Sequence, residues 1–145
     1  MKIKKYALGI LCALGIVCLC ACTSKTSKYD EYHKEVNKLY EQIVTTGAII
    51  DTIDTENEDY KQELYDSLDD LKQAFDDFSK IEPPKEFKDC KMLSEKASTY
   101  ISNSSKCFHL AFDEDYNEEM YNTGKSNYNE AIKCINYMGE VLQNK

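Results

Sequence analysis

The residues of this sequence with the widest chemistry are its cysteines and histidines, because thiolates and imidazoles bind metals and thiolates also form disulfides or attack electrophiles. The 145-residue chain contains 7 cysteines and 2 histidines. Four cysteines lie close together near the N-terminus, at Cys12, Cys18, Cys20 and Cys22. The other three are far apart in the sequence, at Cys90, Cys107 and Cys134. None of these three has the short spacing of a zinc-binding or redox pair, so we expect no metal site there.

Helical geometry restricts how the three later cysteines can pair. Cys90 and Cys107 are 17 residues apart, which is about 25 Å along a helix and too far for a disulfide. If the chain reverses near residue 114, Cys90 and Cys134 lie within about one helical turn of each other. The candidate disulfide is therefore Cys90 to Cys134, and the alternative is three free thiols that pack as small apolar side chains. His33 and His109 are expected on the flanks of helices rather than at a metal.

Residues 1–21 have the features of a secretory signal peptide. Lys2, Lys4 and Lys5 precede an apolar run over residues 6–21, which is too short for a mature membrane-spanning helix. A secreted protein without an anchor, or an uncleaved anchor helix, is the alternative. Removal of residues 1–21 leaves 124 residues with 15 lysines and 26 acidic residues, so the net charge changes from -8 to -11.

The end of this segment, Leu19-Cys20-Ala21-Cys22, resembles the lipobox of bacterial lipoproteins. An aliphatic residue stands three positions before the last cysteine and a small residue directly before it. Cys20 departs from the pattern, which usually has Ala, Ser or Thr there. The resemblance implies cleavage after Ala21, a diacylglycerol thioether on Cys22, and a location on the extracytoplasmic face of the cell membrane. Two acyl chains give stable anchoring where one is marginal.

The chain after the lipobox divides into a lipidated polar linker, residues 22–28, and a helical domain, residues 29–145. Apolar and small residues recur there at alternating spacings of three and four over residues 29–53, 60–81, 87–111 and 121–142. This period predicts an all-α domain, an antiparallel up-down-up-down four-helix bundle. Three long helices are the alternative, if residues 44–60 do not form a turn. In the third stretch the predicted core-facing residues are Phe87, Cys90, Leu93, Ala97, Tyr100, Ser104, Cys107 and Ala111.

Capping residues mark the expected ends of these helices. Thr55 and Asp115 each precede a glutamate by three positions, which predicts that they cap the second and fourth helices. Pro83-Pro84 must end the second helix and can open the third, with Pro84 near its first position. The pattern Pro83-Pro84-x-x-Phe87, followed by a helix with small residues on its seam, weakly resembles uncharacterised small helical lipoproteins of low-GC Gram-positive bacteria. That resemblance implies no functional residue.

The expected topology divides the charge unequally between the two ends of the bundle. The end near the anchor, called the proximal end, comprises residues 23–36, 74–92 and 134–145 and holds 8 lysines against 9 acidic residues. The far or distal end, residues 49–63 and 106–121, holds 2 lysines against 11 acidic residues, a net charge of -9. Acidic residues at these positions stabilise helix N-termini through the helix dipole, and they keep an exposed surface soluble. The alternative is an interaction tip for a cationic partner or divalent cations, formed by Asp113, Glu114, Asp115, Glu118, Glu56 and Glu58.

Two further patterns suggest ligand sites. Asp113-x-Asp115-x-Asn117 matches positions 1, 3 and 5 of an EF-hand loop, but Glu118 and Gly124 stand where that loop needs Gly and a bidentate Glu. We therefore expect at most a weak Ca²⁺ site and no resident metal. A belt of small residues falls at one height of the bundle, which predicts either close helix approach or a cavity for an apolar ligand. The belt comprises Gly47, Ala48, Ser104, Ser105, Gly124 and Ser126.

These observations favour a binding role over catalysis. The acidic charge argues against nucleic acid as a partner, because phosphate binding depends on Lys and Arg. The sequence contains no HExxH, GxSxG, P-loop or dinucleotide-binding pattern, so we expect no enzymatic activity and no cofactor. The predicted function is a lipid-anchored, non-enzymatic interaction module that binds a protein or envelope partner at the cell surface. The alternative is a lipoprotein that carries a small ligand or a divalent cation, using the belt or the tip.

Overall fold

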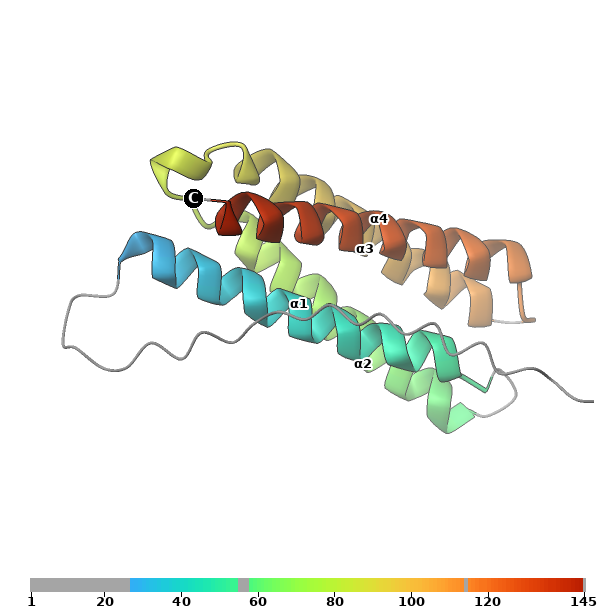
Figure 1. Cartoon of the computed structure of the whole chain (residues 1–145). Coiled ribbons are helices and arrows are strands. Elements are labelled where there is room, and N and C mark those ends of the chain that lie inside the picture. The colour runs from blue at the N-terminus through green and yellow to red at the C-terminus, as the bar shows by residue number, and fades with distance from the viewer. Residues whose placement is uncertain (1–26, 55–57, 114, 145) are drawn as a thin grey trace, which may run out of the picture.

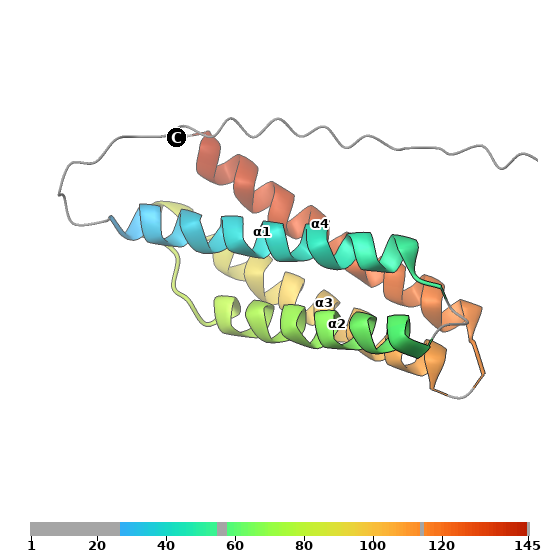
Figure 2. The same cartoon turned by 90° about the horizontal axis from the view of Figure 1, so that it is seen from below.

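The computed structural model describes residues 27–54, 58–113 and 115–144. It contains four helices, which are α1 (Lys28–Thr52), α2 (Glu58–Ser79), α3 (Cys90–Phe112) and α4 (Glu118–Gln143), and a short 3₁₀ helix, η1 (Lys85–Phe87). Consecutive helices run antiparallel, and α1 packs against both α2 and α4 (Figure 1 and Figure 2). The predicted all-α four-helix bundle is confirmed. The three-helix alternative is wrong, because α1 ends at Thr52 before α2 begins at Glu58.

The signal segment, the lipobox with Cys22, and Thr55 lie outside the described residues. None of the described helices is sufficiently long and apolar to cross a membrane. The first described residue, Ser27, caps α1: its hydroxyl oxygen accepts a hydrogen bond from the backbone N–H of Asp30, and the Asp30 carboxylate accepts one from the Ser27 N–H. The Ser27 hydroxyl and the Ser27 backbone N–H both donate hydrogen bonds to the Asp30 carboxylate, and these two bonds lower the pKa of Asp30. The capping box makes α1 begin six residues after Cys22.

Two predicted helix starts are wrong. Asn117, not Asp115, caps α4, because the Asn117 side-chain oxygen accepts a 3.0 Å hydrogen bond from the backbone N–H of Met120. Pro84 opens the η1 turn rather than α3, which begins at Cys90 after a further turn of chain. In both cases the connection between the helices is longer than the capping pattern suggested.

The core follows the predicted seam closely in three helices. Every predicted apolar position from Leu64 to Phe78 on α2 is buried, and so is the α4 series from Gly124 to Leu142. On α3 the predicted positions Leu93, Tyr100 and Cys107 are only half-buried. The fully buried face of α3 is turned one position towards α2, and it includes Ser94, Ser98, Ile101, Ser105, Phe108 and Phe112. This shift arises because α3 packs against α2 as well as α4.

Three tyrosine hydroxyls join α1 to α4 along the length of the bundle. Near the proximal end Tyr29 donates to the carbonyl oxygen of Leu142 at 2.8 Å. In the middle Tyr128 donates to the carbonyl oxygen of Ile43, and near the distal end Tyr121 donates to that of Ile50 at 2.8 Å. These bonds satisfy phenol groups that are buried or half-buried. They fix the register of α1 against α4.

Candidate functional site

The candidate site is the distal end, where the last turns of α1 and α3 and the first turns of α2 and α4 lie, at the opposite end of the bundle from the last turn of α4 (Figure 1 and Figure 2). Of the predicted tip residues, Asp113, Asp115 and Glu118 are exposed on the α3–α4 connection and the first turn of α4. Glu119 is exposed beside them. Glu56, Glu114 and the side chain of Glu58 lie outside the described part of the chain. The topology therefore brings at least four carboxylates to one end.

An aromatic cluster that the sequence reasoning missed lies beneath these acids. Tyr121 makes edge-to-face contacts with Phe108 and Phe112, with ring centroids 5.3 and 6.0 Å apart. Tyr116, on the connection, packs against Phe112 at 5.5 Å and Tyr121 at 5.9 Å. Phe108 and Phe112 are buried, whereas Tyr116 is 47% exposed. The i, i+4 spacing of the two phenylalanines was the available signal for this cluster.

The distal end is braced from α1 by two polar contacts. The Tyr121 hydroxyl bonds to Ile50, as described above, and burial raises the pKa of this phenol. One helical turn along α4, the Lys125 ammonium lies 2.6 Å from the Asp51 carboxylate. The hydrogen bond to Asp51 raises the pKa of Lys125. A hydrogen bond and an ion pair therefore hold the first two turns of α4 against the last turn of α1, next to the acids and the Tyr116 ring.

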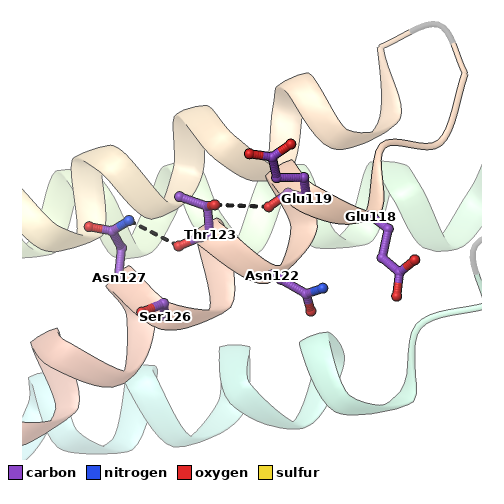
Figure 3. A pocket seen from close by; sticks show the side chains of 6 residues that line it. All are labelled: Glu118, Glu119, Asn122, Thr123, Ser126 and Asn127. Carbon is purple, nitrogen blue, oxygen red and sulfur yellow. Dashed lines mark hydrogen bonds between the residues drawn. The ribbon is translucent and has the colours of Figure 1, made fainter.

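A shallow depression of about 580 Å³ lies on the outer surface of α4, next to this end. Figure 3 shows its lining, in which Glu118 and Glu119 project to different sides of the helix. The hydroxyl of Thr123 donates to the backbone oxygen of Glu119, and the amide of Asn127 donates to that of Thr123. The remaining lining residues, Asn122 and Ser126, are exposed. The depression is therefore an open polar helix surface whose side chains partly bond to their own backbone.

The EF-hand-like segment offers too few oxygen ligands for a Ca²⁺ site. Asn117, its third ligand position, uses its side-chain oxygen to cap α4. Gly124, where a bidentate glutamate would be needed, is buried against Phe108. Within the part of the chain that the structure describes, no three His, Cys, Asp or Glu side chains are grouped so that they could hold a metal ion.

The small residues of the belt bring helices into close contact. A Cβ atom at Gly47 would lie 3.1 Å from the Tyr128 hydroxyl, and one at Gly124 would lie 3.1 Å from the Phe108 ring. The Ser104 hydroxyl donates to the Gly124 carbonyl oxygen at 2.9 Å. The close-approach interpretation is confirmed for these residues. Ala48 and Ser126 are exposed, and Ser105 faces α2, so the six belt residues do not line one cavity.

The three described cysteines are free thiols, and the candidate disulfide between Cys90 and Cys134 is not formed. Cys134 lies near Lys96 of α3, and Lys96 is six residues, about 9 Å, beyond Cys90 along that helix. This offset exceeds the Cα separation of a disulfide. Cys90 instead faces the core beside Tyr32. Burial raises the pKa of both Cys90 and Cys134, which favours the thiol over the thiolate.

A serine, an aspartate and a histidine meet on the α2–α3 seam. The Ser105 hydroxyl donates to Asp69 Oδ1 at 3.3 Å, and His109 Nε2 lies 3.6 Å from the same oxygen. The His109 ring stacks on Tyr65 with centroids 4.1 Å apart. In a hydrolytic triad the imidazole lies between the serine and the carboxylate. Here both contacts end on Asp69, so His109 is not placed to accept the Ser105 proton, and it occupies the helix flank predicted for it.

Comparisons with known proteins identify a family. A protein-family model described as "Domain of unknown function (DUF7018)" matches residues 25–137. The matched residues include all of α1, α2 and α3 and the larger part of α4. No curated protein and no solved structure matches the chain.

Proposed function

The chain belongs to the DUF7018 family, whose function is unknown, and we propose that it is a lipid-anchored, extracytoplasmic interaction module. In this proposal a diacylglycerol thioether on Cys22 holds the proximal end at the cell membrane. The distal end then points outward and binds a cationic segment of a protein partner.

The anchor proposal is supported by the lipobox and by the position of α1, which begins directly after the Ser27 cap. When extended, the chain between Cys22 and Ser27 spans at most ~20 Å. The Ser27 end of α1 lies at the same end of the bundle as Leu142, to which Tyr29 bonds. An anchor at Cys22 would therefore keep the distal end, about 40 Å away along the helices, as the outermost part of the protein.

The binding proposal rests on one observation, an exposed Tyr116 ring on a short stretch of chain that also carries exposed carboxylates. Tyr116 lies between Asp113 and Glu118 in the sequence, and the side chains of Asp113, Asp115 and Glu118 are all exposed. Carboxylates form charge-assisted hydrogen bonds with Lys and Arg, and a tyrosine face adds a cation–π contact. The cluster of Phe108, Phe112 and Tyr121 holds Tyr116 in place, which lowers the entropic cost of binding. A Lys- or Arg-containing segment fits this surface.

A labelled peptide rich in lysine and arginine tests the tip, with a net-neutral peptide of equal length as the reference. We expect the protein to bind the basic peptide, with an affinity that falls as salt rises. The triple variant Asp113→Asn, Asp115→Asn, Glu118→Gln should weaken binding by about tenfold or more, because each lost ion pair in a close contact contributes of order 1 kcal/mol.

The matched control removes the same charge elsewhere. Asp70, Glu95 and Glu140 are exposed on α2, α3 and α4 outside the tip, and their replacement by Asn, Gln and Gln should leave binding nearly unchanged. Equal weakening by both triple variants would show a general charge attraction and contradict the tip. No preference of the native protein for the basic peptide would contradict the proposed function itself.

The alternative function, carriage of a small ligand or divalent cation, has weaker support. Tyr128 and Phe108 occupy the space beside Gly47 and Gly124, and Asn117 is engaged in capping α4. Native mass spectrometry of the protein purified from membranes separates the two functions. A stoichiometric small ligand retained there would favour the carrier.

A further inference from the structure

The α3–α4 face carries an exposed apolar patch close to the proximal end. Met92 on α3 and Tyr137 on α4 are each 56% exposed. Gly124 of α4 lies against Cys107 and Phe108 of α3, so in these antiparallel helices Cys134 is at about the height of Lys96. Met92 lies one turn before Lys96, and Tyr137 lies one turn after Cys134, so in antiparallel helices both are displaced towards the proximal end. Half-buried Leu93 and Val141 belong to the same stretch of the seam.

The patch lies at the end of the bundle where the described part of the chain begins. Met92 is two residues from the start of α3, and Tyr137 is six residues from the end of α4. Both side chains therefore lie within about 10 Å of the proximal end. The residues that precede Ser27 continue from that end, and the stretch from Cys22 to Ser27 reaches at most ~20 Å. A bilayer that holds Cys22 is within reach of the patch.

The chemistry of the patch suits a membrane surface. Methionine is a flexible apolar side chain that adapts to an irregular surface. Tyrosine is enriched where the hydrocarbon core of a membrane meets the lipid headgroups. The exposed residues Lys88 and Lys96 lie one turn to either side of Met92, and so do the exposed acids Asp89 and Glu95. These four charges balance, so the apolar side chains provide the contact, and the lysines can extend their ammonium groups to anionic headgroups. The 11 acidic residues of the distal end are repelled by the same headgroups.

We propose that the patch of Met92 and Tyr137 docks on the lipid bilayer, so that the α3–α4 face of the bundle leans on the membrane while the distal end stays clear of it. This inference rests on the proposed lipid anchor. It adds a second, direct contact between the folded domain and the lipid.

Single tryptophans test the docking, because the chain contains no tryptophan of its own. Met92→Trp and Tyr137→Trp place the probe in the patch. Leu110→Trp is the matched control, because Leu110 is 58% exposed on α3. Five full helical turns separate it from Met92, so it lies on the same face but about 27 Å closer to the distal end. All three sites are exposed, so the bundle fold is retained.

The measurement uses the processed, acylated full protein in vesicles of phosphatidylcholine and phosphatidylglycerol, with and without bromine on the acyl chains. We expect brominated lipid to reduce the tryptophan emission of the Met92→Trp and Tyr137→Trp variants by about twofold, as for an interfacial contact, and to leave that of Leu110→Trp unchanged. Equal quenching at all three positions, or none at any, in vesicle-bound protein overturns the docking and leaves the anchor standing. Failure of the native protein to float with the vesicles overturns both.

Discussion

Gly124 of α4 lies directly against the ring of Phe108 of α3, and a Cβ atom at Gly124 would lie 3.1 Å from Cδ2 and 3.2 Å from Cε2 of that ring. The Gly124 carbonyl oxygen also accepts the hydrogen bond from Ser104. A glycine at this point lets α3 and α4 pack closely beneath the distal end. The aromatic cluster that supports Tyr116 depends on the position of Phe108 in this contact.

Replacement of Gly124 by alanine should lower the free energy of unfolding by about 1 kcal/mol, because crowding of the buried Phe108 ring outweighs the better helix propensity of alanine. Gly139→Ala on the same helix is the control, since nothing beyond its chain neighbours and the backbone of its own helix lies within 4 Å of its Cβ position. That variant should gain roughly 0.5 to 1 kcal/mol. Urea unfolding followed by circular dichroism measures both. A stabilised Gly124→Ala protein would contradict the close packing.

Two buried tyrosines should respond differently to loss of the hydroxyl. Tyr128 is 3% exposed and bonds to Ile43, so Tyr128→Phe should destabilise the protein by about 1 kcal/mol. Tyr32 is 2% exposed, and its hydroxyl has no hydrogen-bond partner among the residues that the structure describes. Tyr32→Phe should therefore be neutral or stabilise by about 1 kcal/mol. The same unfolding measurement tests the pair, and equal destabilisation by both would refute the assignment of these hydrogen bonds.

Stability should fall at alkaline pH. Burial raises the pKa of Tyr32 and Tyr128 well above the ordinary value of 10.0. A tyrosine whose pKa is higher in the folded than in the unfolded state contributes its full stabilisation at pH values below the unfolded-state pKa. That stabilisation is lost as the pH rises above about 10. The free energy of unfolding should thus decline more steeply between pH 9 and pH 11 in the native protein than in the Tyr32→Phe, Tyr128→Phe double variant. Tyr137→Phe, at an exposed site, should leave the decline unchanged.

The lipid anchor makes a direct prediction for Cys22. Cys22→Ala should abolish incorporation of a labelled fatty acid and leave the precursor uncut, so that the protein retains residues 1–21. Cys20→Ala is the control and should be processed normally, because only Cys22 follows a small residue in the lipobox. Labelling of cells and intact mass of the purified protein check both. Unchanged processing and membrane retention of Cys22→Ala would disprove the lipoprotein assignment.

Calcium should leave the melting temperature unchanged. Asn117 is occupied as the cap of α4 and Gly124 supplies no carboxylate, so the Asp113–Asn117 segment offers too few ligands. A ligand present at 100 times its Kd would stabilise the fold by about 2.7 kcal/mol. Calorimetry with and without millimolar Ca²⁺ detects such a change. A shift of several degrees, absent from Asp113→Asn, would support the cation-binding alternative.

The sequence was sufficient for the number and type of helices because the apolar period is unambiguous on α1, α2 and α4. On α3 it was not sufficient. Leu93, Tyr100 and Cys107 form one series with a spacing of seven, and Ser94, Ile101 and Phe108 form a second series beside it. Periodicity alone does not choose between two adjacent faces. The choice depends on contacts with both α2 and α4, which only the folded arrangement supplies.

The candidate site was predicted in part. Four helices joined by short connections run antiparallel to their neighbours. This topology alone is enough to bring Asp113, Asp115 and Glu118 to one end of the bundle. The cap of α4 was misassigned because Asp115 and Asn117 are equally good capping residues, and the length of the connection decides between them. The Tyr116 contact with Tyr121 was missed because it depends on the path of that connection, which no short-range pattern records.

The three tyrosine bonds between α1 and α4 determine how the bundle would transmit force. A pull between an anchor before Ser27 and a partner at the distal end acts along the helix axes. Tyr29, Tyr128 and Tyr121 are spaced along the whole length of the α1–α4 contact, so this pull loads all three bonds together in shear. A perpendicular pull would break them one after another. The bundle should therefore resist a pull along its helix axes better than a pull across them, and the proposed anchor and distal partner would pull along these axes.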